Sequence, residues 1–101
     1  MMISNKSHSM DLYAAIAALS EPEEVQALLI DLCTPQELMA LSQRFSVAKM
    51  LWEEKNYSEI IEATGASSAT VSRVKRSMYN AKGYELVFAG AGASGDGKET
   101  P

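Results

Sequence analysis

Residues 57–76, which read YSEIIEATGASSATVSRVKR, constrain the fold of this chain more than any other segment. Two short stretches with helical periodicity lie on either side of Gly65. Glycine readily adopts the left-handed backbone conformation that ends a helix. The spacing therefore predicts a short helix over 58–64, a tight turn, and a second helix over about 68–80. This is the pattern of a helix-turn-helix.

The side chains of this segment divide into an inner and an outer set. Ser58 and Ser67 precede the two helical stretches closely enough to serve as their N-caps. The residues expected to face inward are Ile60, Thr64, Ala66, Val71 and Val74. The residues expected on the outer face of the second helix are Ser68, Thr70, Ser72, Arg73, Lys75 and Arg76. Hydroxyl, amide and cationic groups on one helix face suit phosphate oxygens and base edges.

Charge is distributed unevenly along the chain. The whole sequence carries a formal net charge of −4, which by itself argues against a nucleic acid partner. Residues 67–82, however, contain four basic residues and no acidic one. One basic helix on an acidic body is typical of a surface that attracts a polyanion such as duplex DNA.

The preceding part of the chain is also predicted to be helical. Helices are expected over about 10–19 and 22–32, and a long third helix is expected to reach about Lys55. Thr34 and Glu37 form a capping-box pattern at the start of that third helix, with Pro35 at its first position. Its apolar seam consists of Leu38, Leu41, Phe45, Ala48 and Trp52.

The chain is expected to contain one domain. The predicted organisation is an N-terminal arm over 1–9, a helical domain over 10–88, and a Gly/Ala/Ser-rich tail over 89–101. The helix over 10–19 is apolar on nearly all sides, and so short a chain offers little surface to bury it. A second copy would supply that surface, so the sequence predicts an all-α homodimer.

Several other classes of protein are disfavoured by composition. The chain has one cysteine, Cys33, and one histidine, His8, so it has no material for a disulfide or a zinc site and little for a catalytic triad. We therefore expect no enzyme activity, no cofactor and no metal. No apolar run is long enough to cross a membrane, and the N-terminus does not read as a signal peptide, so a cytoplasmic location is expected.

The sequence resembles the Trp repressor family, and within it the YerC/YecD-like branch. The residues that carry the resemblance are Thr34, Pro35, Ala40, Leu41, Arg44, Gly65, Ala66, Ala69, Thr70, Arg73 and the run Gly83 to Phe88. The resemblance extends over about Leu28 to Phe88. It implies a bacterial transcription regulator built as an intertwined homodimer, with two helix-turn-helix heads that bind operator DNA.

A site for double-stranded DNA is predicted from the motif. Phosphate contacts are expected from Ser58, Ser67, Arg73, Lys75 and Arg76. Base-edge contacts are expected from Ser68, Ala69, Thr70 and Ser72. Tyr57 either packs against the entry to the first motif helix or contacts the DNA backbone.

A corepressor site is implied only by the resemblance. In Trp repressors, two arginines enclose the indole ring of tryptophan, and Arg44 and Arg73 match that pair. Thr34 and Thr70 match positions near the ligand's polar end. Val74 stands where those repressors have glycine, and its side chain would occupy the space of the ring. We therefore expect DNA binding that does not depend on tryptophan.

Two alternatives of other classes remain open. The basic helix could dock an acidic protein, in which case duplex DNA would not bind in a salt-dependent way. The chain could also be a ligand-responsive regulator with a pocket between the third helix and the helix-turn-helix, in which case an aromatic metabolite would stabilise it.

Overall fold

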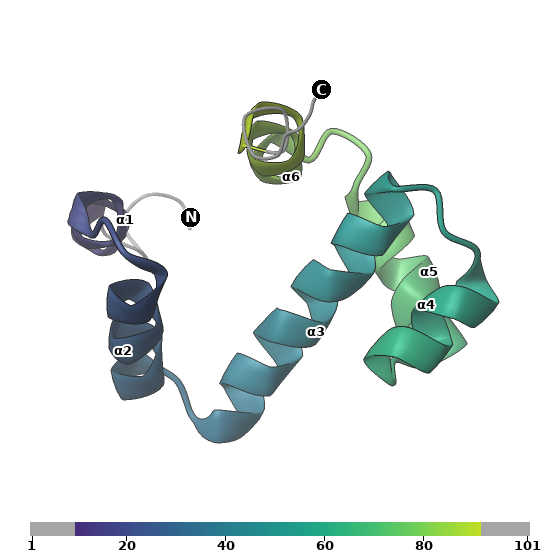
Figure 1. The fold of residues 1–101 in the computed structure, drawn as a ribbon, viewed down its shortest axis with the longest axis horizontal. Helices are drawn as coiled ribbons and strands as arrows, with labels where there is room; N and C mark the ends of the chain where they lie inside the picture. Colours follow the sequence, from purple (N-terminus) through teal and green to yellow (C-terminus); the bar gives the residue numbers. More distant parts are fainter. Residues whose placement is uncertain (1–9, 92–101) are drawn as a thin grey trace, which may run out of the picture. The chain divides into compact units, whose positions relative to one another are not determined.

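A computed structural model describes residues 10–91, and all regular secondary structure in that range is helical (Figure 1). The elements are α1 (Met10–Ala18), α2 (Pro22–Leu32), α3 (Pro35–Trp52), α4 (Tyr57–Thr64), α5 (Ser68–Ser77), α6 (Lys82–Glu85) and a π-helical segment, η2 (Leu86–Ala91). The predicted all-α fold is confirmed. None of these helices is long and apolar enough to cross a membrane.

The described chain divides into two compact units, with the boundary between Leu38 and Met39. The first unit contains α1, α2 and the first turn of α3. The predicted capping box is present at the start of α3. The Glu37 amide donates to Thr34 Oγ1 at 3.0 Å, and the Thr34 amide donates to Glu37 Oε1 at 2.8 Å.

No residue of 10–38 is buried within this single chain. The large apolar side chains more than two-fifths exposed there are Met10, Leu12, Tyr13, Ile30 and Leu32. The sequence predicted that α1 is buried on several sides, and one chain does not provide that burial. Exposed apolar side chains of this number on two short helices are typical of a surface that a partner covers.

The core lies in the second unit, where α3, α4 and α5 meet. Its buried residues are Val47 and Ala48 of α3, Ile60 of α4, Ala66 of the turn, and Val71 and Val74 of α5. Of the seam predicted along α3, only Ala48 is buried, whereas Leu41, Phe45 and Trp52 are 41–45% exposed. The helix therefore uses a neighbouring stripe to hold α4 and α5.

The C-terminal helical turns pack on the end of α3 through aromatic rings. Phe88 lies 5.3 Å from Phe45, 5.6 Å from Trp52 and 5.8 Å from Tyr84, measured between ring centroids. Such pairs favour offset or tilted contacts at these separations. This cluster fixes α6 and η2 to the same unit as the helix-turn-helix.

Two helices end earlier than the sequence predicted. α3 stops at Trp52 rather than near Lys55, because Glu54 adopts a left-handed conformation (φ 65°) and the Lys55 amide donates to the Met50 carbonyl at 3.0 Å. α5 stops at Ser77 rather than near Asn80, which is also left-handed (φ 60°). Neither Glu54 nor Asn80 is a glycine, so the sequence contained no glycine signal for the ends of these two helices.

Helical turns continue past the predicted boundary at Phe88 to Ala91. The predicted arm over 1–9 and the remainder of the predicted tail, 92–101, lie outside the described residues.

Candidate nucleic-acid interface

The first motif helix, α4, begins with a capping box that the sequence analysis missed. Asn56 is the N-cap: its Oδ1 accepts from the Glu59 amide at 2.9 Å, and its own amide donates to Glu59 Oε1 at 2.9 Å. The prediction that Ser58 caps this helix is wrong. Ser58 lies inside the first turn with its side chain exposed. The pattern of Asn56 followed three residues later by Glu59 was the signal available in the sequence.

Three hydrogen bonds stabilise the turn between α4 and α5. Gly65 has φ 76° and ψ 3°, and its amide donates to the Ile61 carbonyl at 2.9 Å, so the predicted left-handed C-cap is confirmed. Thr64 Oγ1 donates to the Ile60 carbonyl at 2.7 Å and accepts from the Ala66 amide at 3.1 Å. These bonds satisfy polar groups that the end of α4 would otherwise leave unpaired.

A side chain of α3 also reaches this turn. Gln43 Nε2 donates to the Thr64 carbonyl at 3.2 Å, and Gln43 is half-buried. The bond joins residues far apart in the sequence, so no local pattern could reveal it. It fixes the position of the turn relative to α3.

The second motif helix, α5, is capped by Ser67 as predicted. Ser67 Oγ accepts from the Thr70 amide at 3.1 Å and donates to Thr70 Oγ1 at 3.1 Å. Val71 and Val74 are buried on the inner side of this helix, at 0% and 4% exposure. Ile60 and Ala66 are buried as predicted, and Thr64 is half-buried. The inner set of the motif is therefore as the sequence predicted.

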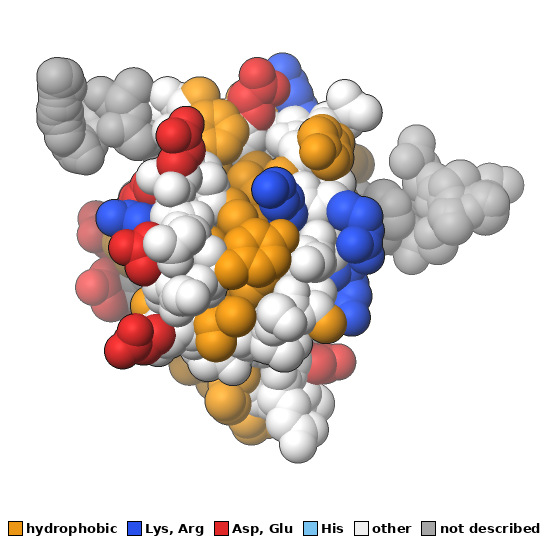
Figure 2. All heavy atoms as spheres, turned by 90° about the vertical axis from the view of Figure 1, so that its right-hand side faces the viewer, with side chains coloured by type: hydrophobic (Ala, Val, Ile, Leu, Met, Phe, Trp, Pro, Cys, Tyr) orange, Lys and Arg blue, Asp and Glu red, His pale blue; other side chains and the backbone are white. Residues whose placement is uncertain are grey.

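The outer face of α5 carries the cations. Arg73, Lys75 and Arg76 are all exposed, and none of them forms an ion pair within residues 10–91. The helix has no acidic residue. Figure 2 faces the side of the molecule on which Figure 1 labels α4 and α5. It shows a group of Lys and Arg side chains along one edge and Asp and Glu side chains along the other, with a hydrophobic strip between them.

The remaining predicted contact residues differ in accessibility. Those with exposed side chains are Ser58, Ser67, Ser68 and Ala69. Thr70 and Ser72 are half-buried rather than fully on the outer face, and both hydroxyls have partners within the chain. The structure thus brings the predicted set together on α4, the turn and α5, with Ser68 and Ala69 the most open of the predicted base-contacting positions.

Tyr57 is the first residue of α4 and packs against α5, a role that differs from the predicted packing at the entry to its own helix, while its predicted contact with the DNA backbone stays a prediction. Its ring is half-buried beside the core, and its hydroxyl lies 3.4 Å from Ser72 Oγ. Lys75 Nζ lies 5.9 Å from the centre of the same ring, within the range of a cation–π contact. One aromatic residue at the start of α4 therefore holds two residues of α5.

The positions implied for a corepressor are placed as follows. Arg44 of α3 and Arg73 of α5 are exposed, and Val74 is buried between α5 and α3. Thr34 is exposed in the first unit. The Val74 side chain forms part of the core, together with Val47 and Ala48.

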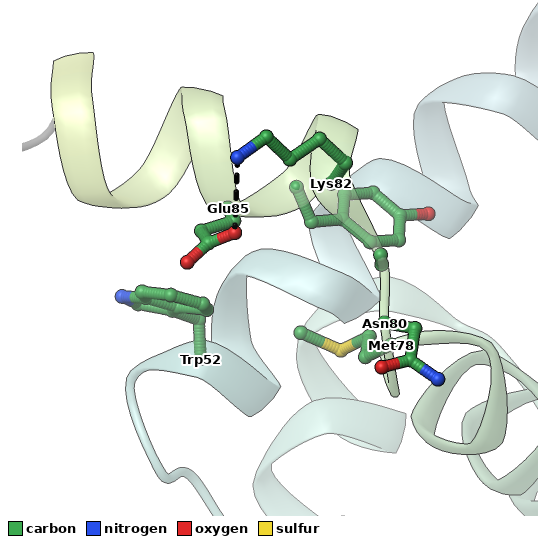
Figure 3. Close-up of a pocket in the computed structure, with 7 residues that line it drawn as sticks. Trp52, Met78, Asn80, Lys82 and Glu85 are labelled. Carbon is green, nitrogen blue, oxygen red and sulfur yellow. Dashed lines mark ion pairs between the residues drawn. The ribbon is translucent and has the colours of Figure 1, made fainter.

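Two hollows lie on the second unit near the end of α3. One of about 460 Å³ is bounded by Trp52, Met78 and the Lys82–Glu85 pair of α6, whose charged atoms are 3.8 Å apart (Figure 3). The other, of about 880 Å³, lies between the end of α3 and α5. Within the described residues, no group of three or more His, Cys, Asp or Glu side chains is arranged to hold a metal ion.

An all-helical chain with a capped, glycine-terminated helix pair and a basic second helix is a helix-turn-helix protein. The model of the family described as Trp repressor protein matches residues 7–89. The chain belongs to the Trp repressor family, a family of DNA-binding regulators.

Relatives place the chain in the YerC-like branch. It is 45% identical to YerC of Bacillus subtilis (strain 168) over 78 residues, which are 76% of this chain and 75% of YerC. The crystal structure of a TrpR-like protein from Eubacterium eligens is 44% identical with a TM-score of 0.78, and the match covers 88% of this chain and 96% of that one. A Trp repressor candidate from Staphylococcus aureus is 38% identical with a TM-score of 0.75, covering 88% and 93%.

Proposed function

We propose that this chain is a sequence-specific transcription regulator that binds duplex DNA as a homodimer, with α5 in the major groove. The observation that carries the proposal is a set of three cations that form no ion pair within residues 10–91, Arg73, Lys75 and Arg76, on the exposed face of a helix whose other face packs into a core. A rigid, cationic helix at a protein surface suits the width and charge of the major groove. Such a regulator acts where the bacterial chromosome lies, in the cytoplasm.

The contacts follow from exposure and chemistry. Phosphate oxygens are contacted by Arg73, Lys75 and Arg76, with Ser58 and Ser67 adding hydroxyl contacts. Base edges are contacted by Ser68 and Ala69 at the start of α5, and by Thr70 and Ser72 in the orientations that their bonds to Ser67 and Tyr57 impose. Phosphate contacts position the helix, and base contacts give the preference among sequences.

The dimer is proposed because one chain leaves its apolar side chains uncovered. Nothing in residues 10–38 is buried, and Leu41 and Phe45 of α3 are also more than two-fifths exposed. We expect sedimentation velocity to give a single species of twice 10.9 kDa. A stable monomer at micromolar concentration would contradict this part of the proposal. Two heads related by a two-fold axis would favour a near-palindromic site, with half-sites roughly 34 Å apart.

DNA binding is tested by fluorescence anisotropy on duplexes selected from a random pool. Affinity is expected to fall steeply between about 50 and 200 mM salt, with a slope near −0.9 per phosphate neutralised. Arg76→Ala is expected to weaken binding to every duplex and to reduce that slope. Thr70→Ala is expected to change the preference among duplexes by ~1–3 kcal/mol.

The control is Lys49→Ala, which removes an exposed lysine of α3 outside the helix-turn-helix. It should leave affinity and slope close to those of the wild-type protein. Absence of salt-dependent binding to any duplex would contradict the proposal and favour the alternative in which α5 docks an acidic protein.

A further inference from the structure

The larger of the two hollows is a groove between the end of α3, the α3–α4 connection and α5. Its volume of about 880 Å³ falls in the range of small-molecule sites. Leu51 and Met78, which also pack on the core, supply apolar surface. The rings of Trp52, Tyr57 and Tyr79 line the groove as well. Aromatic and aliphatic walls of this kind suit a flat aromatic molecule.

The charges in the groove define the ligand further. Lys55 and Lys75 line it, and neither forms an ion pair within residues 10–91. Glu54 also lines it and offsets one of the two positive charges. The groove therefore carries a net charge of +1, which suits a single negative charge. A run of DNA phosphates would meet the Glu54 carboxylate as well as the lysines, so a backbone-binding role fits this groove less well.

We propose that this groove binds a planar aromatic monocarboxylate and that its occupancy lowers the affinity of the protein for DNA. The groove is separate from the position that the arginine pair would define, because neither Arg44 nor Arg73 lines it. The binding part stands on the groove alone. The effect on DNA rests on the proposed function.

The coupling to DNA runs through two residues of α5. Lys75 lines the groove and is also a proposed phosphate contact, so a carboxylate paired with Lys75 competes with the phosphate for the same charge. Tyr57 lines the groove and holds Ser72 through its hydroxyl at 3.4 Å. A ligand that displaces Lys75 from the Tyr57 ring, over which Lys75 Nζ lies at 5.9 Å, therefore acts on the residue that orients Ser72.

Trp52 gives a specific reporter because it is the only tryptophan of the chain. The full-length protein is titrated with 2-naphthoate and, separately, with the neutral 2-naphthamide, while the indole N–H resonance of Trp52 is followed by NMR. We expect saturable shifts with naphthoate and binding at least about fivefold weaker with the amide, since the amide lacks the charge that the lysines attract. Equal binding of both probes would overturn the proposal, because it would show a merely apolar surface.

Three lysine variants locate the ligand. Lys55→Gln and Lys75→Gln are each expected to weaken naphthoate binding roughly three- to tenfold, as for the loss of one charge contact at a partly exposed site. Lys82→Gln is the matched control, since Lys82 lines only the neighbouring hollow that Trp52 also borders. If Lys82→Gln weakens binding and the other two variants do not, the ligand occupies the other hollow and the assignment is wrong.

DNA measurements separate the two proposals. Without ligand, salt-dependent DNA binding by the wild-type protein tests the proposed function by itself. Saturating naphthoate is then expected to weaken DNA binding by about fivefold, a typical coupling between two sites. Tyr57→Phe keeps the ring but removes the bond to Ser72, so at equal naphthoate occupancy, read from the Trp52 resonance, it should show a smaller effect on DNA binding than the wild-type protein. Naphthoate binding with no change in DNA affinity would overturn the regulatory part of the inference alone.

Discussion

Replacing Ile60 with alanine is expected to lower the free energy of unfolding by about 2–5 kcal/mol and to abolish detectable DNA binding. Ile60 is 0% exposed and is the largest of the fully buried side chains. It belongs to the cluster in which α4 meets α3 and α5. Because few side chains in residues 10–91 are buried, the cavity left by truncation removes a large part of the packing that holds α5 in place.

Chemical denaturation at a fixed protein concentration measures this effect, because the stability of a dimer depends on concentration. Ile61→Ala is the matched control: it removes the same atoms from the next residue of α4, which is only half-buried. It should cost clearly less. Equal losses for the two variants, or intact DNA binding by Ile60→Ala, would show that the α4 side of the core does not position α5.

Local sequence signals predicted the local structure well. Both ends of the helix over 22–32 were predicted correctly. Pro22 fits the first turn of a helix, and the capping pattern Thr34 to Glu37 begins the next one. Gly65 and Ser67 marked the turn of the motif because each has a conformational or hydrogen-bonding preference that acts within a few residues. These features need no information from the rest of the fold.

Signals that were present but ambiguous led to errors. Two polar residues, Asn56 and Ser58, competed as caps for α4, and only Asn56 has the glutamate three residues later that completes the box. Shortly after the ends of α3 and α5 come Glu54 and Asn80, which adopt left-handed conformations less readily than glycine does.

No pattern in a single sequence could predict the long-range contacts. The bond from Gln43 to Thr64 and the contact of Tyr57 with Ser72 join different helices. The seam along α3 illustrates a different limit: its apolar spacing is real, but Phe45 remains 42% exposed in one chain. Periodicity shows that a helix face is to be covered and does not show whether the same chain covers it.

Replacing Val74 with glycine is expected to lower the free energy of unfolding by about 3 kcal/mol and to weaken DNA binding in the absence of any small ligand. Val74 is 4% exposed and belongs to the same buried cluster as Val47 and Ala48 of α3. Its loss removes buried apolar surface and adds backbone freedom in the middle of the proposed recognition helix. The resemblance predicts that Val74 occupies the place where Trp repressors have a glycine beside the indole ring, and in this structure its side chain belongs to the buried core.

Val74→Ala separates the two causes, because alanine removes most of the side chain but keeps a good helix former, so about 1 kcal/mol of the loss should be restored. Thermal unfolding and fluorescence anisotropy on the same duplex are measured with and without L-tryptophan. For the wild-type protein, tryptophan should change neither the melting temperature nor the DNA affinity. If tryptophan stabilised the wild-type protein in a saturable way, Val74 would not occupy the space of the ring. In that case a ligand would be needed to position α5. If tryptophan has no effect, packing against α3 is sufficient to position α5.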